Sequence, residues 1–230
     1  MKLQVVSNRK LYLQIADQIR GHILAGAVAP DQLLPSERDL AAQLGVSRPT
    51  VREALIALEV AGLVEVRVGV GAFVRLPVAP LGALPEQSRS PTEIMTVRQM
   101  LEPEAARLAS INITPQLKER LHSVLERMRA ETLAGIWSAA SDRDLHMTIA
   151  EATDNAALRD TLEVVWGFRS DDVDARFHQH LADIKDVRER ILKDHEAIAE
   201  RIIAGDTPGS HAAMASHLDF VATAMTAVWE

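Results

Sequence analysis

Residues 33–74, LLPSERDLAAQLGVSRPTVREALIALEVAGLVEVRVGVGAFV, contain the strongest structural signals in the chain. Ser36 and Ser47 stand where helix N-caps are expected, and Leu44-Gly45-Val46 lies between them as a tight turn. We expect the first helix to run to about Gln43, and Pro49 is tolerated in the first turn of the second. The second helix has one apolar face, made of Val51, Ala54, Leu55 and Leu58. The stretch therefore begins as two helices joined by a short glycine turn.

The period of the pattern changes after Gly62, which breaks the second helix. Apolar and charged residues then alternate, as in a half-buried strand: Val64, Val66 and Val68 alternate with Glu65 and Arg67. Gly69 and Gly71 supply a turn before a second short strand over residues 72–74. An earlier helix is indicated by the spacing of Tyr12, Ile15, Ala16, Ile19 and Ile23. Three helices followed by a hairpin predict a winged helix-turn-helix.

A recognition helix presents cations and small donors at its N-terminal end, where it enters the major groove of DNA. Arg48 is the best candidate for reading a base, because its guanidinium can bind guanine O6 and N7 together. Ser47 and Thr50 can donate to phosphate, and Arg52, one turn after Arg48, is expected to reach a base or a phosphate. Two further candidates lie outside this helix: Arg38 on the preceding helix and Gly69 at the wing tip.

Charge divides the 230-residue chain unevenly. Residues 1–75 have a net charge of +2 and residues 76–230 one of −9, within a total of −7, so a polyanion is expected to meet the N-terminal part. The chain has no cysteine, which excludes disulfides, thiolate catalysis and cysteine zinc sites. A long uncharged apolar stretch and the apolar core of a signal peptide are both missing, so we expect a cytoplasmic protein.

The rest of the chain is organised around a proline-rich segment. Residues 76–90, LPVAPLGALPEQSRS, have no clear period and indicate a linker. Residues 91–230 have helical spacing throughout, without a convincing strand. The expected fold class is therefore mostly α, with a winged helix-turn-helix domain over residues 1–75 and an all-helical bundle over residues 91–230.

Four residues with the character of metal ligands occur on predicted inward faces of this bundle. Asp142 and His146 are four residues apart and share one helix face, while His195 and His217 each interrupt an apolar stripe on another helix. Burying three imidazoles without partners is costly, because each ring has two polar nitrogens. A shared divalent ion would satisfy one nitrogen of each ring, and Asp142 would add an oxygen. Zn is the expected ion, with Ni, Mn, Co or Fe as alternatives; a metal-free, hydrogen-bonded effector pocket is the other interpretation.

Residues 34–74 resemble the signature of GntR-superfamily transcription regulators, and the similarity extends over about residues 10–75. In that family the positions of five of the candidates contact operator DNA: Arg38, Arg48, Thr50, Arg52 and Gly69. Two positions depart from the pattern. Asp31 stands where many members have glycine, and Val68 where some have a polar wing residue.

Four runs of the body, VRQMLEPEAARLA, DRDLHMTIAEATDN, KDHEAIAERIIAGD and MASHL, resemble the effector domain of the FadR-type subfamily, called the FCD domain. This similarity covers about residues 92–228 and implies an effector-binding and dimerisation domain. In metal-bearing members one aspartate and three histidines bind the ion. The matching positions are Asp142, His146, His195 and His217, and all four are present.

An open metal position in a polar cavity of a helical bundle attracts an anion, so a small organic acid is the expected effector: a sugar acid, hydroxy acid, dicarboxylate or amino acid. Four side chains are candidates for binding it: Arg98, Asn155, Trp166 and Arg169. Arg98 precedes Glu102 by four residues, so a helix salt bridge is the alternative, although the matching arginine faces the effector in several FCD proteins. Asn155 is more simply explained as a helix cap. Of the other histidines, His22, His122, His178 and His180 are expected at the surface, and His211 is a spare candidate.

These patterns predict a regulator that binds a two-fold operator as a homodimer and is not an enzyme. The alternative is a metal-dependent hydrolase with a DNA-binding appendage, because three histidines and an aspartate can activate a water. A hydrolase also needs a general base, and no carboxylate is convincingly placed for that role. Asp144 is near Asp142 in the sequence but points to a different helix face.

Overall fold

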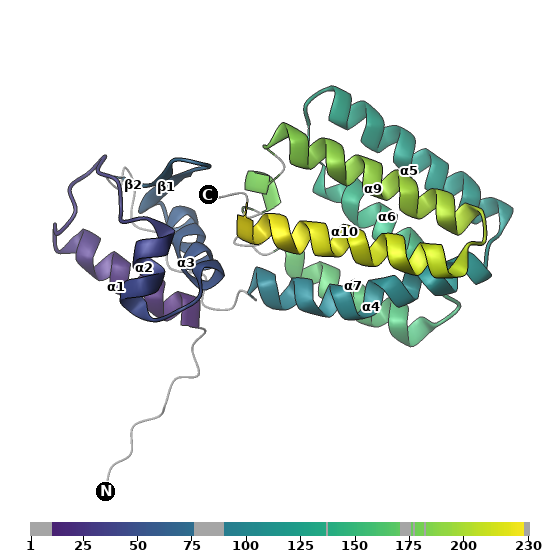
Figure 1. Cartoon of the computed structure of the whole chain (residues 1–230), viewed down its shortest axis with the longest axis horizontal. Helices are drawn as coiled ribbons and strands as arrows, with labels where there is room; N and C mark the ends of the chain where they lie inside the picture. The colour runs from purple at the N-terminus through teal and green to yellow at the C-terminus, as the bar shows by residue number, and fades with distance from the viewer. Residues whose placement is uncertain are drawn as a thin grey trace, which may run out of the picture. The chain divides into compact units, whose positions relative to one another are not determined.

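The computed structural model describes residues 11–75, 90–136, 138–170, 176, 178–181 and 183–227. The chain forms two compact units, residues 1–90 with 229–230, and residues 91–228 (Figure 1). We call the first unit the head and the second the body, and describe each by itself. The predicted linker over residues 76–90 lies, except for Ser90, outside the described residues.

The head is a winged helix-turn-helix, as predicted. Its elements are α1 (Leu11–Leu24), α2 (Glu37–Leu44), α3 (Arg48–Val60), β1 (Val64–Arg67) and β2 (Gly71–Val74). The two strands are antiparallel, with Val64 opposite Val74 and Arg67 opposite Gly71. The segment before α2 lies along the other edge of β2, where Leu33 forms a bridge with Phe73. The wing is thereby attached to the start of the helix-turn-helix.

The turn between α2 and α3 is set by the residues that the sequence indicated. Ser36 caps α2 by accepting a hydrogen bond from the backbone N–H of Asp39, and Ser47 caps α3 through the N–H of Thr50. Between them Gly45 has φ 67°, a left-handed conformation that ends a helix without strain only at glycine. The predicted apolar face of α3 is buried: Val51, Ala54, Leu55 and Leu58.

The body is a bundle of helices, and its described residues contain no strand. The elements are α4 (Pro91–Ile111), α5 (Pro115–Leu133), α6 (Ala139–Glu151), α7 (Ala156–Gly167), η1 (Phe168–Ser170), α9 (Lys185–Ile203) and α10 (Thr207–Ala227). Helix α10 packs against α4 and α9, α5 packs against α6 and α9, and α4 also contacts α6 and α7 (Figure 1). None of the described helices has the length and apolar composition that crossing a membrane requires.

The helices of the body bury the stripes that their spacing predicted. Thr114 caps α5 by accepting from the N–H of Leu117, and the stripe of this helix is buried: Leu117, Leu121, Leu125 and Met128. On α9, His195 is buried together with Ile191 and Ile198, which lie one turn before and after it. Because these apolar neighbours must face the core, they carry the imidazole inward with them.

Candidate nucleic-acid interface and metal centre

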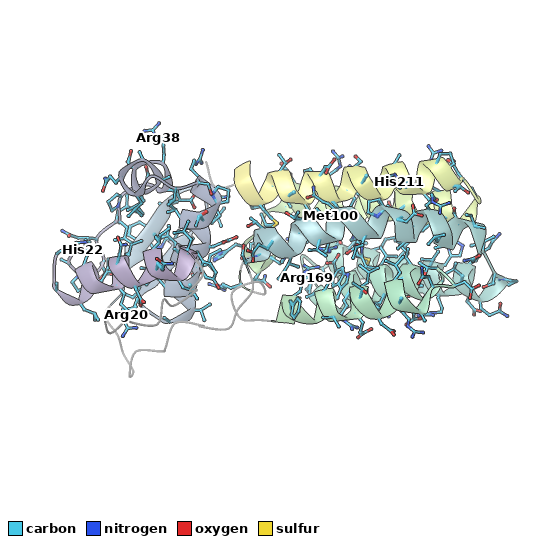
Figure 2. All side chains as sticks on the ribbon, turned by 90° about the horizontal axis from the view of Figure 1, so that it is seen from below. Arg20, His22, Arg38, Met100, Arg169 and His211 are labelled. Carbon is cyan, nitrogen blue, oxygen red and sulfur yellow. The ribbon has the colours of Figure 1, made fainter. Side chains whose placement is uncertain are left out.

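The N-terminal end of α3 presents the polar side chains predicted to meet DNA. Ser47 Oγ accepts a hydrogen bond from the Thr50 N–H at 3.3 Å and lies 2.7 Å from Thr50 Oγ1. On α2, the Arg38 side chain is 83% exposed and stands out from the head (Figure 2). These groups form a cationic and hydrogen-bonding edge on one side of the helix-turn-helix.

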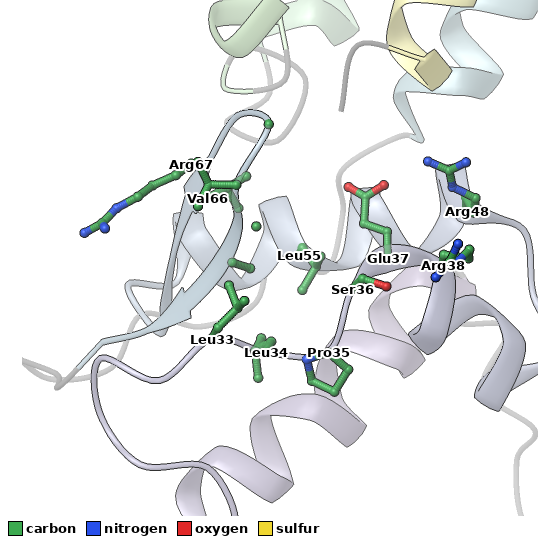
Figure 3. Close-up of a pocket in the computed structure, with 14 residues that line it drawn as sticks. Leu33, Leu34, Pro35, Ser36, Glu37, Arg38, Arg48, Leu55, Val66 and Arg67 are labelled. Atoms are coloured by element: carbon green, nitrogen blue, oxygen red, sulfur yellow. The ribbon is translucent and has the colours of Figure 1, made fainter. Parts of the chain in front are cut away.

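A groove of about 510 Å³ separates the wing from the starts of α2 and α3. Arg38 and Arg48 lie on its helix side, with the wing strands across from them (Figure 3). Gly69 lines the groove at the wing tip, where its φ of 71° suits glycine. Arg67 on β1 also lines the groove, and its guanidinium carbon lies 4.4 Å from the centre of the Phe73 ring. Two of the three predicted arginines, Arg38 and Arg48, therefore share one surface with the wing glycine.

Arg52 is placed differently from the prediction of a residue open to DNA. Its side chain is only 1% exposed, and its Nε and Nη2 donate to the two carboxylate oxygens of Glu37 at 3.0 and 2.6 Å. This bidentate pair connects α3 to the start of α2. The reason is local: Arg52 follows Val51 on the side of α3 that turns into the head, and Glu37 supplies the countercharge there.

Inside the body, four predicted ligands converge from three helices: Asp142 and His146 on α6, His195 on α9 and His217 on α10. His195 Nε2 lies 3.3 Å from His146 Nε2 and 3.2 Å from His217 Nε2. Asp142 Oδ1 lies 3.4 Å from His195 Nε2 and 3.8 Å from His146 Nε2. All four side chains are buried. One nitrogen of each ring and one carboxylate oxygen thus face a common centre.

The cluster has the donor chemistry of a metal site. A neutral imidazole has one N–H, so three Nε2 atoms that face one another cannot all be satisfied by hydrogen bonds among themselves. A tetrahedral Zn ion with bonds of about 2.0–2.1 Å would hold its ligands roughly 3.3 Å apart, close to the separations of the Nε2 atoms. Three nitrogens and one carboxylate oxygen therefore fit a divalent ion.

Two arginines hold the carboxylates around this centre. Arg169 Nη1 donates to Asp142 Oδ2 at 2.8 Å, and Arg98 Nε donates to Glu102 Oε1 at 2.6 Å. Burial raises the pKa of Asp142, but Arg169 and the nearby histidines together lower it by more, so the net pKa is far below the ordinary value. Burial likewise raises the pKa of Glu102, and Arg98 and His146 together more than offset that effect. Both groups are carboxylates at neutral pH.

Trp166 lies between these two ion pairs. The Arg98 guanidinium carbon is 4.2 Å from the centre of the indole ring and that of Arg169 is 4.4 Å away. The indole Nε1 donates to Glu102 Oε1 at 3.1 Å. Three of the four effector candidates, Arg98, Trp166 and Arg169, therefore gather beside the histidines. Arg98 also makes the salt bridge with Glu102 that its spacing allowed.

Two of the three imidazoles, His195 and His217, are kept neutral by their surroundings. Burial lowers the pKa of His195 well below its ordinary value of 6.5, and the neighbouring His217 lowers it further. Burial also lowers the pKa of His217. Both rings are therefore neutral at pH 7, and a neutral ring nitrogen is a ligand without first losing a proton.

The fourth effector candidate is positioned as a helix cap. Asn155 is exposed and caps α7, accepting a hydrogen bond from the Leu158 N–H at 3.1 Å. Asp144 also faces outward, where it pairs with Arg127, as expected from its helix face. It therefore lies outside the histidine cluster.

Two surface predictions for histidines are wrong. His178 and His180 are buried, because His178 lies one helical turn before the buried Leu181 and shares its side of the segment 178–181. Of the remaining histidines, His22 and His122 are exposed as expected. The spare candidate His211 is exposed as well (Figure 2).

Sequence reasoning missed two carboxylates at the outer nitrogens of the cluster. One oxygen of Glu102 contacts His146 Nδ1, and Asp194 Oδ2 lies 3.7 Å from His217 Nδ1. The spacing of Glu102 from Arg98 indicated only a salt bridge, because α4 and α6 meet only after folding. Asp194 precedes a ligand in the sequence but carries no signal of its own.

Comparison with known proteins agrees with the fold of both the head and the body. The family described as "Bacterial regulatory proteins, gntR family" matches residues 11–74, and the FCD domain matches residues 93–220. The chain therefore belongs to the GntR family, in the subgroup with an FCD domain, and is a DNA-binding transcription regulator of that type.

Named relatives extend over nearly the whole chain. The Uxu operon transcriptional regulator of Escherichia coli K12 is 33% identical, covering 94% of this chain and 86% of its own length. The putative L-lactate dehydrogenase operon regulatory protein of the same strain is also 33% identical, with coverages of 96% and 88%. A solved structure, Streptococcus agalactiae GntR, matches with a TM-score of 0.50 and 25% identity, over 93% of this chain and all of the other.

Proposed function

We propose that this regulator binds operator DNA as a homodimer and responds to a small organic acid bound beside a divalent metal in its body. On the DNA side, three of the proposed contacts line the groove between wing and helices: Arg38, Arg48 and Gly69. The other two, Ser47 and Thr50, lie at the capped N-terminal end of α3. Arg52 would have to exchange Glu37 for a phosphate to join them. Each protomer supplies one recognition helix to one half-site.

One observation carries the sensing half of the proposal: three buried imidazole Nε2 atoms, with His195 Nε2 3.2–3.3 Å from the other two, point at one another beside Asp142. Without a shared cation this arrangement leaves lone pairs or N–H groups opposed in a buried site. We assign Asp142, His146, His195 and His217 as ligands, with Zn as the preferred ion. The residues keep the ion in place, and the ion supplies a Lewis-acidic position for the effector.

The chemical class of the effector is inferred from the charges around that position. Arg98 and Arg169 are each matched by one carboxylate, Glu102 and Asp142, so a bound divalent ion adds positive charge that has no described countercharge. A carboxylate ligand supplies it, with Trp166 and the two arginines along its path. One relative is named for an L-lactate dehydrogenase operon, which supports a small hydroxy acid or a similar acid as the effector class.

Regulation then follows from linkage between the two sites. If the acid changes operator affinity by some factor, operator DNA changes the affinity for the acid by the same factor. In this proposal the body is a sensor without turnover, and the protein acts in the cytoplasm, where operator DNA is found. Asp144, the nearest carboxylate in the sequence, is engaged with Arg127 and supports no hydrolytic role.

The test uses full-length protein purified without a histidine tag. Elemental analysis should find about one divalent ion per chain, and a thermal-shift screen of organic acids should find a binder only when that ion is present. The same acid should change the fluorescence anisotropy of labelled operator DNA. His195→Ala should lose the ion, whereas the matched control His122→Ala, an exposed histidine on α5, should keep it. A metal-free protein that still binds the acid would overturn the metal half of the proposal.

A further inference from the structure

We propose that Glu102 is a positioning residue for the metal centre: it holds His146 in the tautomer and orientation that direct Nε2 toward the other ligands. The proposal rests on the metal site proposed above. It assigns a role to a residue that is neither a ligand nor an effector candidate. Glu102 lies on α4, whereas all four proposed ligands lie on α6, α9 and α10.

The contact between Glu102 and His146 fixes the proton on the ring. A carboxylate only accepts hydrogen bonds, so its contact with Nδ1 requires the proton on that nitrogen. The lone pair of a neutral ring is then on Nε2, and Nε2 is the atom that lies 3.3 Å from His195 Nε2. Metal-bound histidines commonly donate their other N–H to a carboxylate in this way, which orients the ring and increases its basicity.

Glu102 is itself held so firmly that it can orient its neighbour. Arg98 donates to Oε1 through Nε at 2.6 Å and to Oε2 through Nη2 at 3.5 Å, Trp166 donates to Oε1 at 3.1 Å, and Oε2 also contacts His146. The carboxylate is buried, with 2% of its surface exposed. A salt bridge that only stabilised α4 could equally lie on the exposed side of the helix, as the pair of Glu104 and Arg107 does.

His217 shows the same arrangement in a looser form. Its Nδ1 and Asp194 Oδ2 are 3.7 Å apart, and both atoms are buried without another hydrogen-bond partner among the described residues. Arg190 holds the other oxygen of Asp194 at 2.7 Å. Two of the three imidazoles therefore have a carboxylate, anchored by its own arginine, at the nitrogen that faces away from the centre.

The decisive measurement is Zn affinity, determined by competition with a chromophoric chelator. Glu102→Gln, which keeps an acceptor but loses the charge, should lower the affinity about tenfold, and Arg98→Met/Glu102→Leu, which removes the acceptor, up to about 100-fold. The double variant also avoids leaving Arg98 buried and unpaired, so it should fold. Glu104→Gln, an exposed-side control on the same helix, should bind Zn like the parent.

A structural effect is separated from positioning by a double-mutant cycle. In a His146→Ala background, Glu102→Gln should change Zn affinity less than twofold, because its target is gone. Equal affinity of parent and Glu102→Gln, or the same tenfold loss in the His146→Ala background, would overturn the proposal. If the parent binds no Zn, the proposed metal site fails. Nitrogen-15 NMR of His146 in metal-free protein still tests Glu102, since the Nδ1–H tautomer should dominate in the parent and lose its preference in Arg98→Met/Glu102→Leu.

Discussion

The head and the body use polar residues in opposite ways. The head presents Arg38 and Ser47, two of the proposed DNA contacts, at its surface, where water hydrates them, and its core is formed mainly by aliphatic residues. The body buries Asp142 and three histidines in the middle of its bundle, where each polar atom needs a partner from another helix. A binding edge for a macromolecule therefore costs the head little stability, whereas the proposed sensing site is built into the core of the body.

The contrast between head and body is tested most strongly by replacing one of the proposed metal ligands in the body. His195→Ala should abolish the stabilisation by metal, which amounts to about 4 kcal/mol when the free ion is at 1,000 times its Kd. Calorimetry of parent and variant, each with and without chelator, measures this difference. In the variant, chelator should leave the melting temperature unchanged. A chelator response that persists would place the ion elsewhere.

Acid should destabilise the body through its buried histidines. His195 and His217 have folded-state pKa values below 6.5, so below about pH 6.5 the unfolded chain binds protons that the folded body does not. Stability of the metal-free protein should therefore fall as pH decreases, by up to about 1.4 kcal/mol per pH unit for each imidazole. Urea unfolding at several pH values between 7.5 and 5 measures how steeply the free energy of unfolding depends on pH. His195→Ala should roughly halve this slope, and a slope that is unchanged would contradict burial of the neutral ring.

Removing a cation from the groove of the head should affect DNA binding and nothing else. Arg48→Ala should weaken operator binding by about 1–3 kcal/mol and relax the preference for one base pair, without changing the Zn affinity. Anisotropy titrations with operator variants at several salt concentrations measure both the affinity and the base preference. Arg20→Ala is the matched control, since Arg20 is a partly exposed arginine on α1 paired with Asp17. Operator affinity that survives Arg48→Ala would remove this residue from the interface.

The smallest effect is expected at Asn155, where the sequence left two roles open. If it acts only as the cap of α7, Asn155→Ala should cost about 1 kcal/mol of stability and leave effector affinity unchanged, while Asn155→Asp should restore the cap. Thermal unfolding and titration with the acid found in the screen separate the two. If Asn155→Asp is as stable as the parent but no longer binds the acid, Asn155 belongs to the effector site.

The same contrast explains which features the sequence predicts. Caps and turns are local, so Ser36, Gly45 and Ser47 are sufficient to indicate the helix-turn-helix from the order of residues alone. The stripe around His195 shows that it faces inward, but not what lies opposite. Partners that depend on packing between elements carry no local signal: Glu37 beside Arg52, and Glu102 beside His146, become visible only when two helices meet.

Trp166 gives the centre a spectroscopic consequence. Its indole touches both guanidiniums and donates its N–H to the acid that supports His146. Emission from an indole depends on the electric field along the ring. An incoming anion that shifts either arginine should therefore change the emission wavelength or the quantum yield of Trp166. In a protein whose other two tryptophans are replaced by phenylalanine, intrinsic fluorescence would then report occupancy of the proposed effector site in real time, without any label.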